Sequence, residues 1–170
     1  MNYQLVYCSR NRIPGSQQEV AAEIDSILVA SRRNNAANDV TGALLFNGEA
    51  FAQVLEGPRD SVDITYAKLR FDARHSNVIL LQQANQLERD FGIWTMAYSD
   101  ARFSALELPA LDLIEADPEG FAGEMLRLLK AVVDAHAAKR IVSEMLLLLA
   151  LQSVAHCNVV AFGKRGQFAT

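Results

Sequence analysis

Gln53 is the residue whose type and surroundings most strongly indicate chemistry in this chain. It is the one amide in the apolar stretch from Phe51 to Leu55. A buried amide without partners costs about 1–3 kcal/mol, and an amide offers both donors and an acceptor. Tyr7 lies in a second β-type stretch and has a hydroxyl that needs a partner when buried. The pair fits either a hydrogen-bond switch against a ligand ring or a core Tyr–Gln bond that fixes strand register.

Three further polar groups lie at expected ends of secondary structure. Asn34-Asn35 follows a helical stretch, where it is either a C-cap or a ligand contact. The charged segment 72–75 (DARH) ends a second helix and is either a solvated terminus or a rim for a polar ligand tail. Glu56, before Gly57-Pro58, is a possible general base, but a single carboxylate is weak evidence for an enzyme.

Several function classes have no support in the sequence. The chain contains no Walker loop, no GxGxxG and no Ser-His-Asp arrangement. Two histidines, His136 and His156, lack companions at metal-ligand spacing, so no metal site is expected. The net charge is -4 with no basic stripe, which argues against nucleic acid as a partner.

Cysteine usage and hydropathy predict a cytoplasmic protein. Cys8 and Cys157 lie far apart and form no CxxC, which is typical of a reducing compartment. No signal peptide is visible at the start of the chain. The most apolar segment, 141–160, contains polar residues and an unbroken apolar core too short to span a bilayer.

The residue patterns predict an α+β fold of the order β-α-β-β-α-β-β. Strands are expected at 3–9, 40–46 and 50–56, from 78 onward and at 94–98, with helices from 17 to about 35 and from 60 to 69. A right-handed crossover places both helices on one face of a mixed sheet. The result is a ferredoxin-like sandwich with an extra strand.

The other face of this sheet also needs a cover. Inward and outward positions of the first and third strands are both largely apolar. Residues 101–162 are therefore expected to form a helical extension, broken near 137–140, that covers this face. The segment 141–155 is apolar nearly all round and should be buried against the sheet or a second subunit. A flexible tail is expected over 163–170.

Residues 2–98 resemble the BLUF domain, a flavin-dependent blue-light sensor. No single motif is specific, but six occur in the family's order and spacing over more than half of the chain. They are 5–9 (LVYCS), 31–35 (SRRNN), 40–46 (VTGALLF), 51–57 (FAQVLEG), 72–75 (DARH) and 89–98, which contains RDF and WTMAY. The resemblance predicts a BLUF domain over residues 1–100.

The resemblance implies a role for each matching residue. An isoalloxazine ring is expected between the two helices, edge-on to Gln53 as the switching glutamine, with Tyr7 as the photochemical tyrosine. Trp94 and Met96 match a last-strand pair that relays the signal. Asp39 stands where many relatives have glycine, which affects the turn before the second strand. The other expected flavin contacts are Asn34, Asn35, Lys68 (where an arginine is expected in relatives), Asp72, Arg74 and His75.

The expected function is therefore that of a blue-light photoreceptor without enzymatic activity. FAD is the expected chromophore, with FMN or riboflavin as alternatives. The C-terminal helices are expected to signal to a separate downstream protein and to form a homo-oligomer, either a dimer or a larger assembly. The alternative is a ferredoxin-like small-molecule enzyme or ligand-binding regulator without photochemistry. Colour separates the two, because only the photoreceptor is yellow and responds reversibly to blue light.

Overall fold

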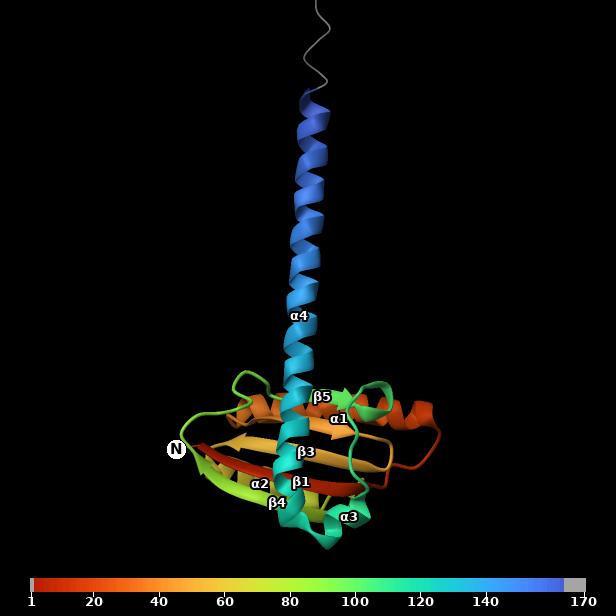
Figure 1. Cartoon of the computed structure of the whole chain (residues 1–170), viewed down its shortest axis with the longest axis vertical. Helices are drawn as coiled ribbons and strands as arrows, with labels where there is room; N and C mark the ends of the chain where they lie inside the picture. The colour runs from red at the N-terminus through yellow and green to blue at the C-terminus, as the bar shows by residue number, and fades with distance from the viewer. Residues whose placement is uncertain (1, 164–170) are drawn as a thin grey trace, which may run out of the picture. The chain divides into compact units, whose positions relative to one another are not determined.

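A computed structural model describes the backbone of residues 2–163 and the side chains of residues 2–102 and 104–146. Five strands and two helices form the first part of the chain, and a short 3₁₀ turn and two further helices follow (Figure 1). In chain order the elements are β1 (Asn2–Asn11), α1 (Gln17–Ala37), β2 (Thr41–Phe46), β3 (Ala50–Gly57), α2 (Arg59–Arg70), β4 (His75–Gln86), β5 (Ala97–Asp100), η1 (Ala101–Phe103), α3 (Leu111–Ala116) and α4 (Pro118–Gly163).

The five strands form one mixed sheet in the order β4-β1-β3-β2-β5. Only the β2–β5 pair is parallel, and the other neighbours are antiparallel. In this register Tyr7 lies directly opposite Gln53 on adjacent strands. The predicted element order and the ferredoxin-like sandwich with an extra strand are confirmed.

The last strand begins later than predicted. β5 starts at Ala97, so Trp94 and Met96 lie in the segment before it. Two features keep this segment out of the strand. A turn closes from Trp94 N to Phe91 O at 2.9 Å, and side chains of α1 bind the carbonyls of Thr95 and Met96. These tertiary contacts override the local β-type sequence.

Helix α1 begins with a capping box and runs past its predicted end. Ser16 and Glu19 bind each other's backbone and side chain at the first turn. The helix continues to Ala37, and Asn38 caps it by donating to the carbonyls of Asn34 and Asn35. The two asparagines therefore lie within the last turn. Asp39 follows with φ of 54°, the left-handed conformation that favours glycine.

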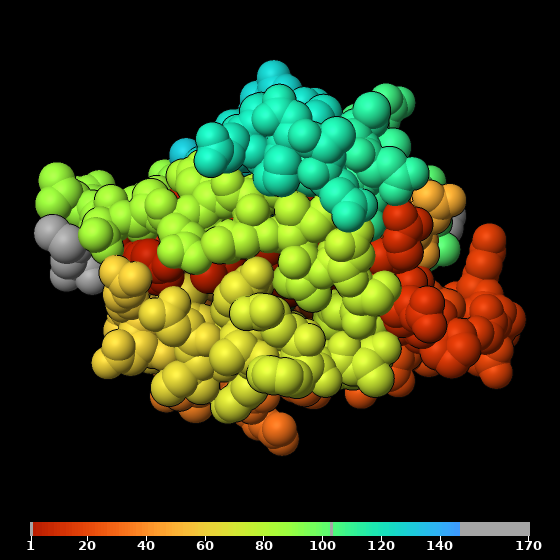
Figure 2. Space-filling view, turned by 90° about the horizontal axis from the view of Figure 1, so that it is seen from below, coloured from red at the N-terminus to blue at the C-terminus, as the bar shows by residue number. Residues whose placement is uncertain are grey.

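Each face of the sheet has its own core, as the apolar alternation predicted. Tyr7, Leu5 and Leu55 pack with Ile24 and Leu28 of α1 and with α2. The opposite face, which includes Val6, Cys8 and Val54, packs against buried residues of α3 and of the first turns of α4. Figure 2 shows this layering at β4, where α2 lies on one side and the start of α4 on the other. The cover predicted from the C-terminal third is confirmed.

Helix α4 runs from Pro118 to Gly163 without the predicted break. No glycine or proline interrupts residues 124–160, and Arg140 and Glu144 form an i,i+4 ion pair of 3.4 Å where the break was expected. The chain divides into two compact units, residues 1–134 and 135–170. Among the described residues, no helix is both long and apolar enough to pass through a membrane.

The predicted burial of 141–155 fails within the single chain for the side chains that are described. The apolar side chains between 141 and 146 are each more than half exposed; they are Ile141, Val142, Met145 and Leu146. The side chains of 147–155 lie outside the described residues, as does the predicted tail from 164 onward. Burial against a second subunit and the domain boundary near residue 100 stay predictions.

Candidate functional site

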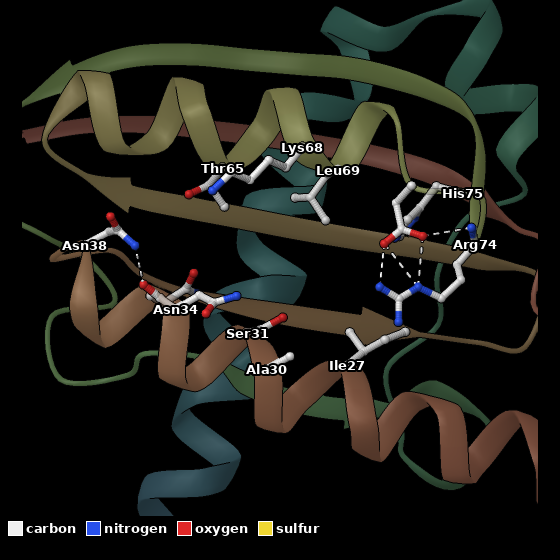
Figure 3. Close-up of a pocket in the computed structure, with 12 residues that line it drawn as sticks. Ile27, Ala30, Ser31, Asn34, Asn38, Thr65, Lys68, Leu69, Arg74 and His75 are labelled. Atoms are coloured by element: carbon white, nitrogen blue, oxygen red, sulfur yellow. Dashed lines mark hydrogen bonds and ion pairs between the residues drawn. The ribbon is translucent and has the colours of Figure 1, made fainter.

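A pocket opens between α1 and α2 and contains most of the predicted contact residues. Asn34 and Ser31 of α1 face Lys68 and Thr65 of α2 across it (Figure 3). Ile27, Ala30 and Leu69 give the pocket apolar walls, and polar groups gather at its ends. The complete lining is Ile27, Ala30, Ser31, Asn34, Asn35, Asn38, Thr65, Lys68, Leu69, Asp72, Arg74 and His75.

Tyr7 and Gln53 lie in the core on the sheet face that carries this pocket, although neither lines it. The Tyr7 hydroxyl donates a hydrogen bond to Gln53 Oε1. Gln53 Nε2 donates in turn to Met96 Sδ at 3.6 Å. Sulfur is a weak acceptor, so the amide is held firmly at its oxygen and loosely at its nitrogen.

Burial keeps the Tyr7 hydroxyl protonated. Tyr7 has no exposed surface, and this desolvation raises its pKa well above its ordinary value of 10.0. The nearby Tyr66, with ring centroids 5.4 Å apart, raises the pKa further. Tyr7 is therefore a neutral donor at physiological pH, as its bond to Gln53 requires.

The two asparagines of α1 have different surroundings. The Asn35 side chain is buried and donates to the carbonyl of Thr95 at 2.6 Å. The exposed Asn34 faces the pocket, and its carbonyl accepts the Asn38 side-chain amide at 2.7 Å. Asn35 thus ties the pocket to the segment before β5, and Asn34 lies at the pocket's open side.

Charged groups close the other end of the pocket (Figure 3). The Arg74 guanidinium binds the Asp72 carboxylate through two nitrogens and Glu23 Oε1 at 2.9 Å. The Arg74 hydrogen bond lowers the pKa of Asp72. His75 Nδ1 lies 2.9 Å from Ser9 Oγ, and burial lowers the pKa of the imidazole. Lys68 completes this polar lining from α2.

Trp94 and Met96 belong to opposite faces of the sheet. Met96 is buried in the Tyr7 cluster, whereas Trp94 packs against the core beneath α3 and α4. Hydrogen bonds to three consecutive carbonyls hold the segment from Trp94 to Met96 in place. Trp94 O accepts Gly42 N at 2.8 Å, Thr95 O accepts Asn35, and Met96 O accepts Arg32 Nε at 3.1 Å. Met96 is therefore the member of the pair that touches Gln53.

Sequence reasoning missed some pocket residues and misjudged one acid. Ile27, Ser31 and Asn38 line the pocket together with Asn34, at successive spacings of three to four residues along α1 and its C-cap, a signal that marks a common surface. The position of Glu56 does not suit a general base for a ligand in this pocket. It lies on the opposite sheet face, where three N–H groups bind its carboxylate. Among the described residues, no group of His, Cys, Asp or Glu side chains is arranged to hold a metal.

The protein is an α+β sandwich. It has a pocket with polar ends between two helices and a buried Tyr–Gln pair on the same face of the sheet. A family model described as sensors of blue light using FAD matches residues 3–97. Because this match covers more than half of the chain, the protein belongs to the BLUF family of flavin-dependent blue-light sensors.

Individual relatives agree with this assignment. The chain is 37% identical over 98 residues to the blue light- and temperature-regulated antirepressor BluF of Escherichia coli (strain K12), covering 58% of the chain and 23% of the relative. It is 31% identical over 118 residues to a photoactivated adenylate cyclase subunit beta of Euglena longa, covering 69% and 13%. The chain thus spans less than a quarter of the length of these relatives.

Solved structures of shorter proteins match over more of their length. The dark-state structure of BlrB, a BLUF protein, superposes with a TM-score of 0.63 at 31% identity, covering 79% of this chain and 96% of BlrB. The ground state of BlsA gives a TM-score of 0.64 at 26% identity, covering 76% and 88%.

Proposed function

We propose that this chain binds a flavin between α1 and α2, with the ring edge toward Gln53. The pocket residues fit such a ligand. Apolar walls from Ile27, Ala30 and Leu69 suit an aromatic ring, while the amides of Asn34 and Asn35 suit its carbonyl groups. The polar end at Asp72, Arg74 and His75 suits a hydroxylated side chain.

FAD is the flavin that we propose, following the family's description. The lining residues mainly fit the ring and the first part of its side chain, so FMN and riboflavin are the alternatives. Extraction of the chromophore from purified protein, followed by chromatography against the three standards, identifies the form. Recovery of FMN or riboflavin alone would contradict the FAD proposal without affecting the site.

A bound flavin supplies blue-light absorption and, once excited, a strong oxidant. In our proposal Tyr7 would donate one electron to the excited flavin, and its hydroxyl proton would follow to the flavin through Gln53, the group to which it already donates. Both the electron and the proton return to Tyr7 when the charges recombine. The cycle therefore has no net oxidation, and what persists is the rearranged Gln53 amide.

The observation that carries this proposal is the uneven bonding of Gln53. Its oxygen accepts the Tyr7 hydroxyl, while its nitrogen has only the weak acceptor Met96 Sδ. When the Tyr7 proton moves, the strong bond is interrupted and the amide can rotate or tautomerise at little cost. A new hydrogen bond from Gln53 to the ring edge then stabilises the excited state and shifts the absorption to the red.

The test is the absorption spectrum of the purified chain under dark and blue light. The proposal expects a yellow protein whose spectrum moves reversibly to the red and recovers thermally in the dark. A colourless chain that cannot be loaded with flavin would favour the alternative, a ligand-binding regulator or small-molecule enzyme that uses the same pocket. Flavin binding without any red shift would contradict the switch but not the pocket.

We further propose that the chain has no enzymatic activity and signals to a separate protein. The apolar side chains exposed between 141 and 146 support self-association by a second copy of the chain. Analytical ultracentrifugation of wild type and Met145→Glu tests this, with a loss of dimer expected only in the variant. A monomeric wild type would contradict it.

The predicted cytoplasmic location rests on the free buried thiol of Cys8.

A further inference from the structure

A second buried polar group lies on the sheet face opposite the pocket. Glu56, 1% exposed, is the second-last residue of β3. Its carboxylate accepts Gln4 Nε2 at 2.7 Å, Phe91 N at 2.8 Å and Asp90 N at 3.2 Å. A buried carboxylate is costly unless such hydrogen bonds are made. Because three donors bind this one carboxylate, the fold holds the Glu56 side chain in a fixed position.

Two of these donors belong to the segment that carries Trp94 and Met96. Residues 87–96 run from β4 at one edge of the sheet to β5 at the other. Glu56 binds this segment through the backbone of Asp90 and Phe91. Three residues away on the same strand, Gln53 binds it through Met96 Sδ. Strand β3 thus holds one segment at two points, from opposite faces.

A closed turn joins these two points. Trp94 N donates to Phe91 O at 2.9 Å, so residues 91–94 form a short, hydrogen-bonded unit. Few residues therefore separate Met96 from the closed turn that contains Phe91. Phe91 has no exposed surface and belongs to the same buried cluster as Met125 and Leu129 of α4.

Asp90 connects this segment to α4 through charge. Its Oδ2 lies 2.9 Å from Lys130 Nζ, and the side chains of Lys130 and Asp90 are 45% and 35% exposed. Asp90 Oδ2 also accepts Gln4 Nε2 at 3.4 Å, which joins it to the Glu56 group. The contact lies within the compact unit formed by residues 1–134.

We propose that Glu56 is a positioning residue that sets the segment 90–96 against Gln53, and that Asp90 and Lys130 carry its displacement to α4. The proposal rests on the Gln53 switch proposed above. Movement of the Gln53 amide changes its contact with Met96, the closed turn moves, and the Asp90–Lys130 pair shifts with it. Helix α4 thereby receives the signal at Lys130 as well as through its chain connection to β5.

The first test is hydrogen exchange of the flavin-loaded full chain, measured in the dark and under blue light. Lys130→Met removes the charge and keeps the apolar stem. It should retain the red shift, while the light-induced exchange change in 118–134 falls about fivefold or more, a typical allosteric coupling. Arg127→Met is the matched control, because the Arg127 partner, Glu124, lies in the same helix. It should behave as wild type.

Charge reversal separates coupling from simple damage. The double variant Asp90→Lys with Lys130→Asp should restore most of the light-induced change that either single variant loses. Equal light-induced changes in Lys130→Met and wild type would overturn the proposed link. Absence of a red shift in wild type would instead overturn the Gln53 switch, so the two failures are distinguishable.

A second test needs no flavin. Glu56→Gln removes the charge that the amides of Asp90 and Phe91 bind. It also replaces one of the two oxygens, which accept these amides separately, by an N–H-bearing nitrogen. It should speed the exchange of these two amides in the dark while the strand amides of β1 and β3 keep their protection. A merely structural role would speed exchange throughout the core. Unchanged exchange at Asp90 and Phe91 would overturn the positioning role, and if the variant does not fold, Lys130→Met carries the test.

Discussion

The two faces of the sheet bury polar groups in opposite ways. On the α1/α2 face, Gln53 has one strong hydrogen bond and one weak contact to sulfur. On the α3/α4 face, Glu56 is bound by three N–H donors. An amide with a weak partner can change state at little cost, whereas a fully bonded carboxylate resists change. Strand β3 therefore carries both a side chain that can change its hydrogen bonds, Gln53, and one whose hydrogen bonds are fixed, Glu56.

The largest expected effect is the loss of photochemistry on removal of the Tyr7 hydroxyl. Tyr7→Phe should bind flavin and remain yellow, yet show no persistent red shift, because neither the proton nor the phenol donor is present. Absorption spectra before and after blue light measure this. Tyr66→Phe is the matched control, since its ring lies 5.4 Å from Tyr7 on the same face. A normal red shift in Tyr7→Phe would refute the donor role.

Gln53→Leu tests the movable group itself. The variant should bind flavin and lose the red shift, because a leucine side chain has no amide to rearrange. It should also lose the light-induced exchange change in α4. Normal photocycling in Gln53→Leu would show that the amide has no part in the mechanism. The proposed difference in function between the two faces of the sheet would then be wrong.

On the opposite face, a core truncation should affect stability but not photochemistry. Leu129 of α4 has no exposed surface and packs beneath the sheet. Leu129→Ala should lower the free energy of unfolding by about 2–5 kcal/mol, as expected for a large-to-small core substitution. Urea denaturation measures this, and the red shift of the folded variant should persist. Loss of the red shift at full folding would mean that the two faces are less separate than proposed.

The smallest expected effect is a loss of stability at alkaline pH that depends on Cys8. Burial raises the pKa of this thiol from 9.0 to about 12. The unfolded chain loses its proton near pH 9 while the folded chain keeps it, so rising pH favours unfolding. At pH 10 the unfolded state is favoured by about 1.4 kcal/mol relative to pH 7, at 1.36 kcal/mol per pH unit above the unfolded pKa. Cys8→Ala should unfold with a correspondingly weaker pH dependence between pH 8 and 10.

The strands could be predicted from local patterns, and the resemblance to a known family indicated the contact between Tyr7 and Gln53, which are 46 residues apart. The period of two along a strand fixes which side chains share a face, and the sequence motifs placed Tyr7 and Gln53 on facing strands. The placement of Trp94 and Met96 could not be predicted in this way. It is set by Arg32 and Asn35, which lie about sixty residues away and bind backbone carbonyls.

Other features depend on burial that a sequence does not reveal. Glu56 was correctly predicted at the end of a strand, but Gly57-Pro58 after it indicates an exposed turn, and the side chain is instead 1% exposed. The continuity of α4 was missed for a related reason. Its expected break rested on the size of a compact domain, and the helix instead continues into a second unit at residue 135.

The backbone amide of Gly42 is a suitable probe for movement of the segment before β5. A side chain there would meet Val54 O at 2.0 Å, so the site admits only glycine. Its amide is nevertheless the one that binds the Trp94 carbonyl. Glycine amides form a sparse, well-separated region of a nitrogen–proton correlation spectrum. A single resonance, from a residue that does not line the pocket, can therefore report in real time whether light has displaced the polypeptide beside Met96.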